Sequence, residues 1–238
     1  MYLHICYKFR PGLQCPGDAL NNEVIAEEAN ECQQYRSVNA TNGCFVAGTL
    51  VHTKEGLKPI EQIRVGDMVL SQPDMKGELA YKPVVNTFEF EDKVVGLLEF
   101  FADSKECLLG RLVVTPNHPF WVKDVGWTSA ENLEAGQRFI LYDGSTAAVW
   151  QYRELRNTEV QNKAWACEFH PEVGNIVDFR SDSFVVIDEE SWNAYALALE
   201  GGWLKRKVYN LEVEDFHTYY VGELGVWVHN TNCDGKIG

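Results

Sequence analysis

From residue 44 onward, the chain consists of short β-rich runs separated by Gly, Pro and Asp. Four of these runs are residues 49–53, 68–71, 94–100 and 111–115. Short runs rich in Val, Leu and Thr and bounded by turn residues are typical of β-strands. A chain with many such strands folds as a sandwich, a barrel or a coiled β-assembly, so we expect an all-β fold.

A weak internal repeat supports this expectation. Gly56, Glu61 and Gly66 recur 70 residues later as Gly126, Glu131 and Gly136. Each copy reads as a strand, a glycine turn, a short helical turn, a second glycine turn and a strand. Two such copies predict a β-fold with pseudo-twofold symmetry.

The two flanks and one internal segment differ from this pattern. Residues 1–43 include helix formers over 22–31 and end in a loop, which predicts a partly helical N-terminal flank. Residues from about 142 to 206 are less regular, and we interpret them as an insertion. We therefore expect one β-domain over 44–230, followed by a C-terminal flank over 231–238.

Charge and composition exclude several classes of function. The formal net charge is -14, which argues against nucleic acid or an anionic membrane as the main partner. The first residues lack the apolar core of a secretory signal, and no run is long enough to span a bilayer. We expect a soluble fragment, monomeric by default, which could belong to a larger exported protein.

A thiol follows a glycine directly at Gly43–Cys44. A thiol is the most nucleophilic common side chain, and attack on the Gly43 carbonyl would convert the amide into a thioester. The short loop Thr115-Pro116-Asn117-His118 supplies an imidazole, and we expect His118 to act as acid or base there. The Thr115 hydroxyl is a candidate for orienting this site.

A second reactive group lies near the other end, in His229-Asn230-Thr231. The carboxamide nitrogen of Asn230 can attack its own backbone carbonyl, which releases Thr231 and leaves a succinimide. This reaction is slow in free peptides, so positioning must supply most of the acceleration. His229 and His217 are the candidate imidazoles that protonate the leaving amine and polarise the carbonyl.

Four blocks occur in a fixed order in the sequence: residues 44–49 followed by 60–71, then 115–118, 208–222 and 226–230. These blocks resemble those of the Hint superfamily, which comprises inteins, hedgehog autoprocessing domains and bacterial intein-like domains. The residues in these blocks are most similar to those of the Hint domains of bacterial polymorphic toxins. This resemblance implies a horseshoe of short strands that cleaves its own backbone in a single turnover, without metal or organic cofactor. It also implies that the partners are the flanking segments, an upstream delivery region and a C-terminal effector.

Two departures from the family pattern bear on the outcome. Splicing members often carry Asp where this chain has Asn210, and Thr231 is a weaker acceptor than Cys or Ser. We therefore expect independent cleavages at Gly43–Cys44 and Asn230–Thr231 more than ligation. The alternatives are true splicing with Thr231 as acceptor, an inactive Hint scaffold that links two regions, and a thiol protease that acts on other chains.

Overall fold

The computed structural model describes residues 43–73, 77–104, 106–167, 174–180, 183–187 and 202–230 of the chain. These residues are almost entirely β-structure, which confirms the all-β prediction. The expected helical flank, the C-terminal flank and much of the segment after β14 lie outside the described residues. The described part contains no helix with the length and apolar character that crossing a membrane requires.

The described residues form 17 strands, and every pairing between them is antiparallel. The strands are β1 (Phe45–Val46), β2 (Leu50–Thr53), β3 (Gly56–Pro59), β4 (Met68–Ser71), β5 (Ala80–Val94), β6 (Gly96–Ala102), β7 (Leu109–Val114), β8 (Pro119–Val122), β9 (Gly126–Ser129), β10 (Arg138–Ile140), β11 (Thr146–Asn157), β12 (Lys163–Cys167), β13 (Gly174–Arg180), β14 (Ser183–Ile187), β15 (Lys205–Val213), β16 (Thr218–Val221) and β17 (Val226–His229). Two short 3-10 turns, η3 (Ile60–Gln62) and η4 (Ala130–Asn132), lie between them.

The predicted internal repeat is confirmed. The unit β2–β3–η3–β4 recurs as β8–β9–η4–β10, and the last three elements of each copy begin 70 residues apart. The turn glycines Gly56 and Gly126 have φ values of 111° and 100°, and Gly66 and Gly136 have 95° and 89°. Residues with a Cβ atom rarely adopt these values, which explains why glycine marks the repeat in the sequence.

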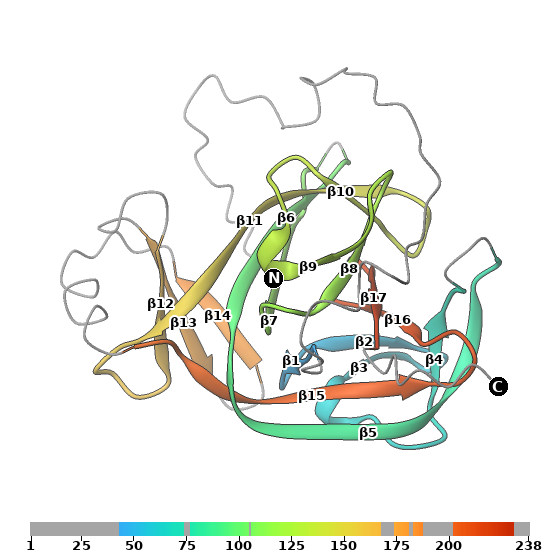
Figure 1. The fold of residues 1–238 in the computed structure, drawn as a ribbon, viewed down its shortest axis with the longest axis horizontal. Helices are drawn as coiled ribbons and strands as arrows, with labels where there is room; N and C mark the ends of the chain where they lie inside the picture. The colour runs from blue at the N-terminus through green and yellow to red at the C-terminus, as the bar shows by residue number, and fades with distance from the viewer. Residues whose placement is uncertain are drawn as a thin grey trace, which may run out of the picture.

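Long strands connect the two copies of the repeat. β5 and β15 pair along most of their length and lie together at the lower edge of Figure 1, while β6 pairs with both β7 and β11. The short strand β1 lies between β7 and β15, because Phe45 pairs with both Val114 and Tyr209. The strand that begins just after Cys44 is therefore central, with a neighbour on each side.

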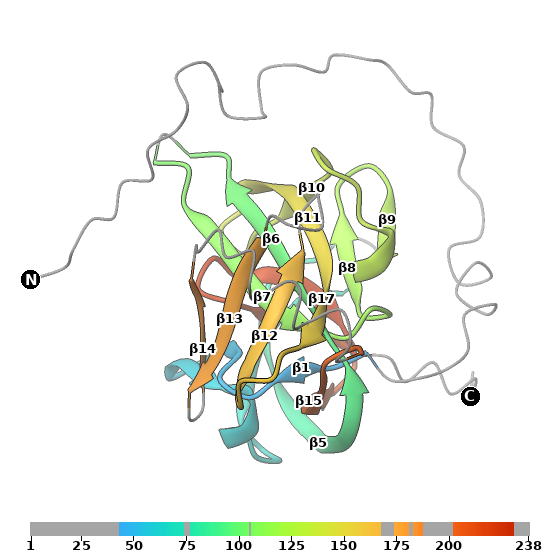
Figure 2. The ribbon, with the colours of Figure 1, turned by 90° about the vertical axis from the view of Figure 1, so that its left-hand side faces the viewer.

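A small antiparallel group extends from the end of β11. The last residues of β11 pair with β12, and β12, β13 and β14 follow as a meander, seen at the front of Figure 2. These three strands lie within the segment that we interpret as an insertion. Since β11 itself also pairs with β6, the boundaries at about 142 and 206 stay a prediction.

One apolar core holds the strands that carry the candidate site. Phe45, Phe120, Phe139, Tyr219 and Val228 are all fully buried in it. Phe120 contacts Phe45 edge to face at 6.2 Å between ring centroids, and it contacts Phe139 at 5.4 Å with the rings tilted by 31°. Burial of one such side chain contributes about 1.5–3 kcal/mol to stability, so β1, β8, β16 and β17 are firmly fixed relative to one another.

Candidate functional site

Two reciprocal hydrogen bonds join Cys44 to Thr115. The Cys44 N–H donates to Thr115 Oγ1 at 2.9 Å, and the Thr115 N–H donates to the Cys44 carbonyl at 3.0 Å. Both residues are buried. The Cys44 nitrogen is the atom that would leave if the Gly43–Cys44 bond broke, so the Thr115 hydroxyl contacts the leaving group directly.

The His118 imidazole is buried against Gly43. A Cβ atom added to Gly43 would lie 2.6 Å from His118 Cα and 2.8 Å from Nδ1, too close for unbonded atoms. On the other side, the imidazole lies 4.2 Å from the Phe45 ring, measured between centroids. Glycine is therefore required before Cys44, because any side chain there would displace the imidazole.

Burial sets the protonation states of this half of the site. It lowers the pKa of His118 to about 3; the main chain of Gly43 acts in the opposite direction, and the charge of His229 lowers the pKa further. Burial also raises the pKa of the Cys44 thiol to about 12, and Lys93 offsets part of this effect. At neutral pH the resting site thus holds a protonated thiol and a neutral imidazole, which can accept a proton.

Asn230 lies at the other half of the site, only 2% exposed. Its surroundings assign the orientation of its amide: Nδ2 donates to the His217 carbonyl at 2.6 Å, and Oδ1 accepts from the Val213 N–H at 2.9 Å. The Asn230 main-chain N–H also donates to the His217 carbonyl, at 2.8 Å. Three contacts therefore fix both the backbone and the side chain of the residue that would attack itself.

His229 contacts the carbonyl that Asn230 would attack. Its Nδ1 lies 2.6 Å from the Asn230 carbonyl oxygen. A carbonyl oxygen only accepts hydrogen bonds, so Nδ1 must carry the proton in this contact. The Trp127 ring packs edge to face against the imidazole at 5.1 Å between centroids, which holds it in place. A hydrogen bond of this kind draws electron density from a carbonyl, and the catalytic role of His229 stays a prediction.

His217 contacts Asn230 through its main-chain carbonyl. Its carbonyl accepts both hydrogen bonds from Asn230, while its side chain is exposed. Its φ of 54° is unusual for a residue with a side chain, and it turns the carbonyl toward Asn230. The predicted role of the His217 imidazole stays a prediction, and the contact with Asn230 is one that the sequence motif did not indicate.

Strand pairing brings the two halves together. Val228 of β17 pairs with Phe120 of β8 in antiparallel register. Continued past the end of β17 and the start of β8, the same register brings Asn230 and His118 to the same side of this pair of strands. The charge of His229 also reaches His118, as its effect on the pKa of His118 shows. The predicted N-terminal and C-terminal groups therefore belong to one site, although Thr231 lies outside the described residues.

Asn210 forms a hydrogen-bonded pair with a tyrosine that the sequence analysis did not select. The Tyr219 hydroxyl donates to Asn210 Oδ1 at 2.9 Å, and the Leu211 N–H donates to the same oxygen at 2.8 Å. Burial raises the pKa of Tyr219 well above its usual value, and the nearby Cys44 adds to this effect, so the hydroxyl stays protonated. All four residues of β16 are buried, and nothing in its sequence distinguishes Tyr219 from its neighbours, which is why its link to Asn210 was not predicted.

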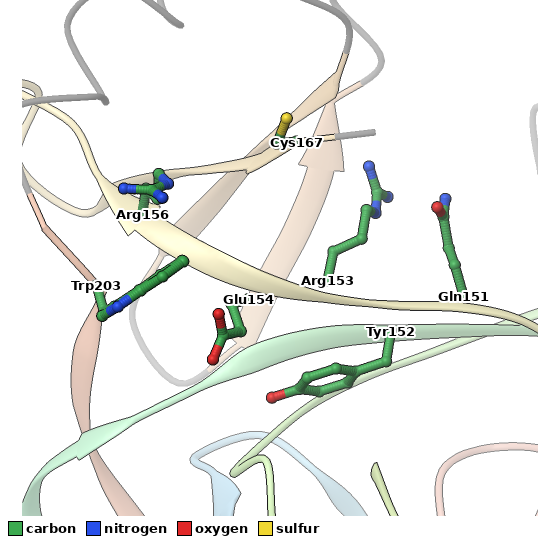
Figure 3. A pocket seen from close by; sticks show the side chains of 7 residues that line it. All are labelled: Gln151, Tyr152, Arg153, Glu154, Arg156, Cys167 and Trp203. Carbon is green, nitrogen blue, oxygen red and sulfur yellow. The ribbon is translucent and has the colours of Figure 1, made fainter. Parts of the chain in front are cut away.

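A more open hollow of about 370 Å³ lies elsewhere, along β11 and β12 (Figure 3). Both of its arginines have structural partners: Arg153 pairs with the buried Glu99, and the Arg156 guanidinium lies 4.1 Å from the centre of the Trp203 ring. Neither Cys44 nor Asn230 lines this hollow. The lining of this hollow therefore does not connect it with the site that contains Cys44 and Asn230.

The chain is similar in structure to a bacterial intein-like domain from Clostridium thermocellum, with 28% sequence identity and a TM-score of 0.51; the match covers 79% of this chain and 98% of that domain. It also matches the gp41-1 intein (18% identity, TM-score 0.47, 80% of this chain and 100% of the intein). A DnaB intein from Synechocystis sp. PCC 6803 matches with 14% identity and a TM-score of 0.46, over 79% and 99% of the two chains. A comparison with curated proteins found no match.

The fold is thus that of an intein-like Hint domain, as the resemblance in the sequence predicted. The pretoxin Hint domain family matches residues 50–169, about half of the chain. The chain therefore belongs to the pretoxin Hint family, whose fold is consistent with autoprocessing. Thr115 and His118 lie inside the matched residues, whereas Cys44 and Asn230 lie outside them, so their roles rest on the geometry above.

Proposed function

We propose that this domain cleaves its own backbone at Gly43–Cys44 and at Asn230–Thr231 and so releases a C-terminal effector. The observation that carries the proposal is the setting of Asn230. Its amide is held by His217 and Val213, and its carbonyl accepts a hydrogen bond from His229 at 2.6 Å. A nucleophile, its electrophile and a proton donor are thus arranged within one residue and its nearest neighbours.

In the C-terminal reaction, Asn230 Nδ2 attacks the Asn230 carbonyl carbon and the bond to the Thr231 nitrogen breaks. Nδ2 loses a proton and the Thr231 nitrogen gains one, which leaves a succinimide and a free amine. His229 stabilises the negative charge that develops on the carbonyl oxygen. Fixing the amide in this geometry contributes to catalysis, since orientation in intramolecular reactions is worth up to about 7–11 kcal/mol.

In the N-terminal reaction, Cys44 Sγ attacks the Gly43 carbonyl carbon and the bond to the Cys44 nitrogen breaks. The thiol loses its proton to solvent before the attack, and the neutral His118 imidazole donates its N–H proton to the leaving Cys44 nitrogen and regains one from solvent, so that the imidazole ends unchanged. Thr115 orients that nitrogen as it leaves. Water or an external thiol then opens the thioester, which frees a new end at Gly43 and regenerates the thiol.

The natural setting of this chemistry is a larger protein. We infer from the pretoxin family that an upstream delivery region precedes the domain, that a toxin follows it, and that the whole is secreted. The reaction occurs once per chain, so the domain is a single-turnover device whose partners are its own flanking segments. In such a protein, cleavage at Asn230 releases the segment that follows residue 230.

A time course of intact mass tests the proposal. The purified chain is incubated with and without a small thiol, and we expect fragments that end at Gly43 to form much faster with thiol than by hydrolysis alone, and fragments that end at Asn230 to form equally in both samples. A product in which Gly43 is joined to Thr231 would show splicing and overturn the proposal of independent cleavages. A single unchanged mass in all samples would overturn self-cleavage altogether and leave a structural scaffold.

Replacing Thr115 by Val is expected to slow thiol-dependent cleavage at Gly43–Cys44 by about 10- to 100-fold, because the leaving nitrogen loses its hydrogen-bond partner. Thr115→Ser keeps the hydroxyl and should restore most of the rate. The measurement is the rate of appearance of the Gly43-ended fragment, with Tm as the control for folding. Equal rates in wild type and Thr115→Val would show that the hydroxyl has no part in the reaction.

The N-terminal reaction is expected to accelerate steadily from about pH 6 to pH 9. The thiol, with its pKa raised to about 12, becomes more ionised at each step, by about tenfold per pH unit. His118, with its pKa lowered to about 3, stays neutral over the whole range, so it adds no falling limb. Trapping the thioester with a nucleophile that is unprotonated throughout the range measures this step alone. A bell-shaped profile with a maximum near neutral pH would contradict these protonation states.

A further inference from the structure

Two buried hydroxyls connect the start of β16 to the end of β4. Thr218 Oγ1 donates to the Gln72 carbonyl at 2.5 Å and accepts from the Gln72 N–H at 3.3 Å. Ser71 Oγ donates to the Thr218 carbonyl at 2.6 Å. Both Ser71 and Thr218 are fully buried. A buried hydroxyl is stable only where its partners are present, so this network specifies one position for Thr218.

Thr218 lies between the two groups that contact Asn230. The residue before it is His217, whose carbonyl accepts from both Asn230 nitrogens. In the pairing of β16 with β17, Thr218 is opposite His229, whose imidazole contacts the Asn230 carbonyl. Thr218 thus directly follows the residue whose carbonyl holds the attacking nitrogen, and it faces the His229 imidazole that contacts the Asn230 carbonyl.

The His217 carbonyl needs this support, because His217 itself makes few contacts that hold its backbone in place. His217 has a left-handed backbone, with φ of 54°, and Asp215 two residues earlier has φ of 63°. Conformations of this kind persist in residues with side chains only when the surroundings hold them. The exposed His217 side chain offers no core packing, whereas Thr218, one peptide bond away, is fixed by hydrogen bonds on both its side chain and its carbonyl.

We infer that Thr218 is a positioning residue for the Asn230 reaction: its hydroxyl, bound to Gln72, orients the His217 carbonyl that holds the attacking amide nitrogen. This inference rests on the proposed function, since it assigns a residue to the same reaction. Reactions within one residue depend steeply on geometry, and a misplacement of about 1 Å can cost about 100-fold in rate. Loss of the Thr218 hydroxyl should therefore slow cleavage at Asn230 strongly, while the fold is retained.

The test compares Thr218→Val, which keeps the shape and removes the hydroxyl, with Thr218→Ser, which keeps the hydroxyl. Thr53→Val is a matched control, because the Thr53 hydroxyl also donates to a carbonyl, at Gly56, and accepts from an N–H, at Glu55, in the hairpin of β2 and β3. Three quantities are measured for each variant: the rate of cleavage at Asn230, the rate of thiol-dependent cleavage at Gly43, and Tm.

We expect Thr218→Val to slow cleavage at Asn230 by at least about tenfold and to change cleavage at Gly43 by less than about twofold. Thr218→Ser should restore the Asn230 rate, and Thr53→Val should leave both rates unchanged. Equal slowing of both reactions in Thr218→Val, or a normal Asn230 rate, would overturn the inference. So would an Asn230 rate in Thr218→Ser as low as in Thr218→Val.

A second readout separates failure of this inference from failure of the proposed function. Hydrogen exchange of the Asn230 side-chain amide, measured by NMR in ¹⁵N-labelled, uncleaved protein with His229→Ala, which removes the contact to the attacked carbonyl and keeps the amide, reports the bond to the His217 carbonyl without requiring cleavage. We expect slow exchange in this background and at least about tenfold faster exchange when Thr218→Val is added. If the wild type is never cleaved at Asn230, the proposed function fails while the exchange result still decides the role of Thr218. Unchanged exchange would overturn that role.

Discussion

Replacing Asn230 by Ala is expected to abolish cleavage after residue 230, with a loss of at least about 1000-fold in rate. The substitution removes the attacking nitrogen itself, and neither His229 nor His217 can replace it, because both act on the residue that it belongs to. Cleavage at Gly43 should continue, since Cys44 and Thr115 are untouched. Intact mass after a long incubation with thiol measures both reactions in one sample.

Asn230→Asp is the matched control for this prediction. It keeps the size of the side chain but replaces the amide with a carboxylate, which cannot form the succinimide by the same attack. We expect it to lose cleavage after residue 230 as fully as Asn230→Ala. Continued cleavage at that bond in both variants would mean that water or another side chain cuts it, and the proposed role of Asn230 would be wrong.

Replacing Cys44 by Ala is expected to abolish thiol-dependent cleavage at Gly43, again by at least about 1000-fold. Without the sulfur, no thioester forms and an added thiol has no activated carbonyl to attack. The fold should tolerate the change, because Cys44 is a small residue in an apolar core cluster and alanine removes only its sulfur. Cleavage after Asn230 should continue, and it serves as an internal test that the site is still formed.

Cys44→Ser tests the chemistry of this half more closely. The hydroxyl is a weaker nucleophile than the thiol, so slow formation of an ester is the expected result. That ester should be far less sensitive to added thiol than the wild-type thioester. Thiol-dependent cleavage at Gly43 in Cys44→Ala at the wild-type rate would show that another group attacks this bond.

The sequence predicts the fold well because glycine marks the places where the backbone must adopt positive φ. Gly56 and Gly126 occupy matching turns, and the repeat found from them is the repeat of the structure. The candidate site residues are also visible in the sequence, because their proposed chemistry depends on residue type and on neighbours along the chain. Gly43 beside Cys44 and His229 beside Asn230 are pairs of this kind. In the structure, the Cys44 N–H donates to the buried Thr115, and the His229 imidazole contacts the carbonyl of the buried Asn230.

The remaining features depend on contacts between distant segments and could not be predicted. Thr218 binds Gln72 across 146 residues, and Thr115 binds Cys44 across 71. The contact between the His217 carbonyl and Asn230 could not be predicted either, because main-chain groups leave no mark in a sequence. The low pKa of His118 and the high pKa of the Cys44 thiol likewise come from burial, which only the folded core creates.

The central claim is that Asn230 cuts the chain with its own side chain, and the mass of the released fragment tests it most directly. Cyclisation leaves a C-terminal succinimide, so the fragment that ends at residue 230 should first appear one water molecule lighter than the product of hydrolysis. It should gain that water slowly as the succinimide opens. A fragment that carries an ordinary Asn230 carboxylate from its first appearance, and never the lighter mass, would contradict the account.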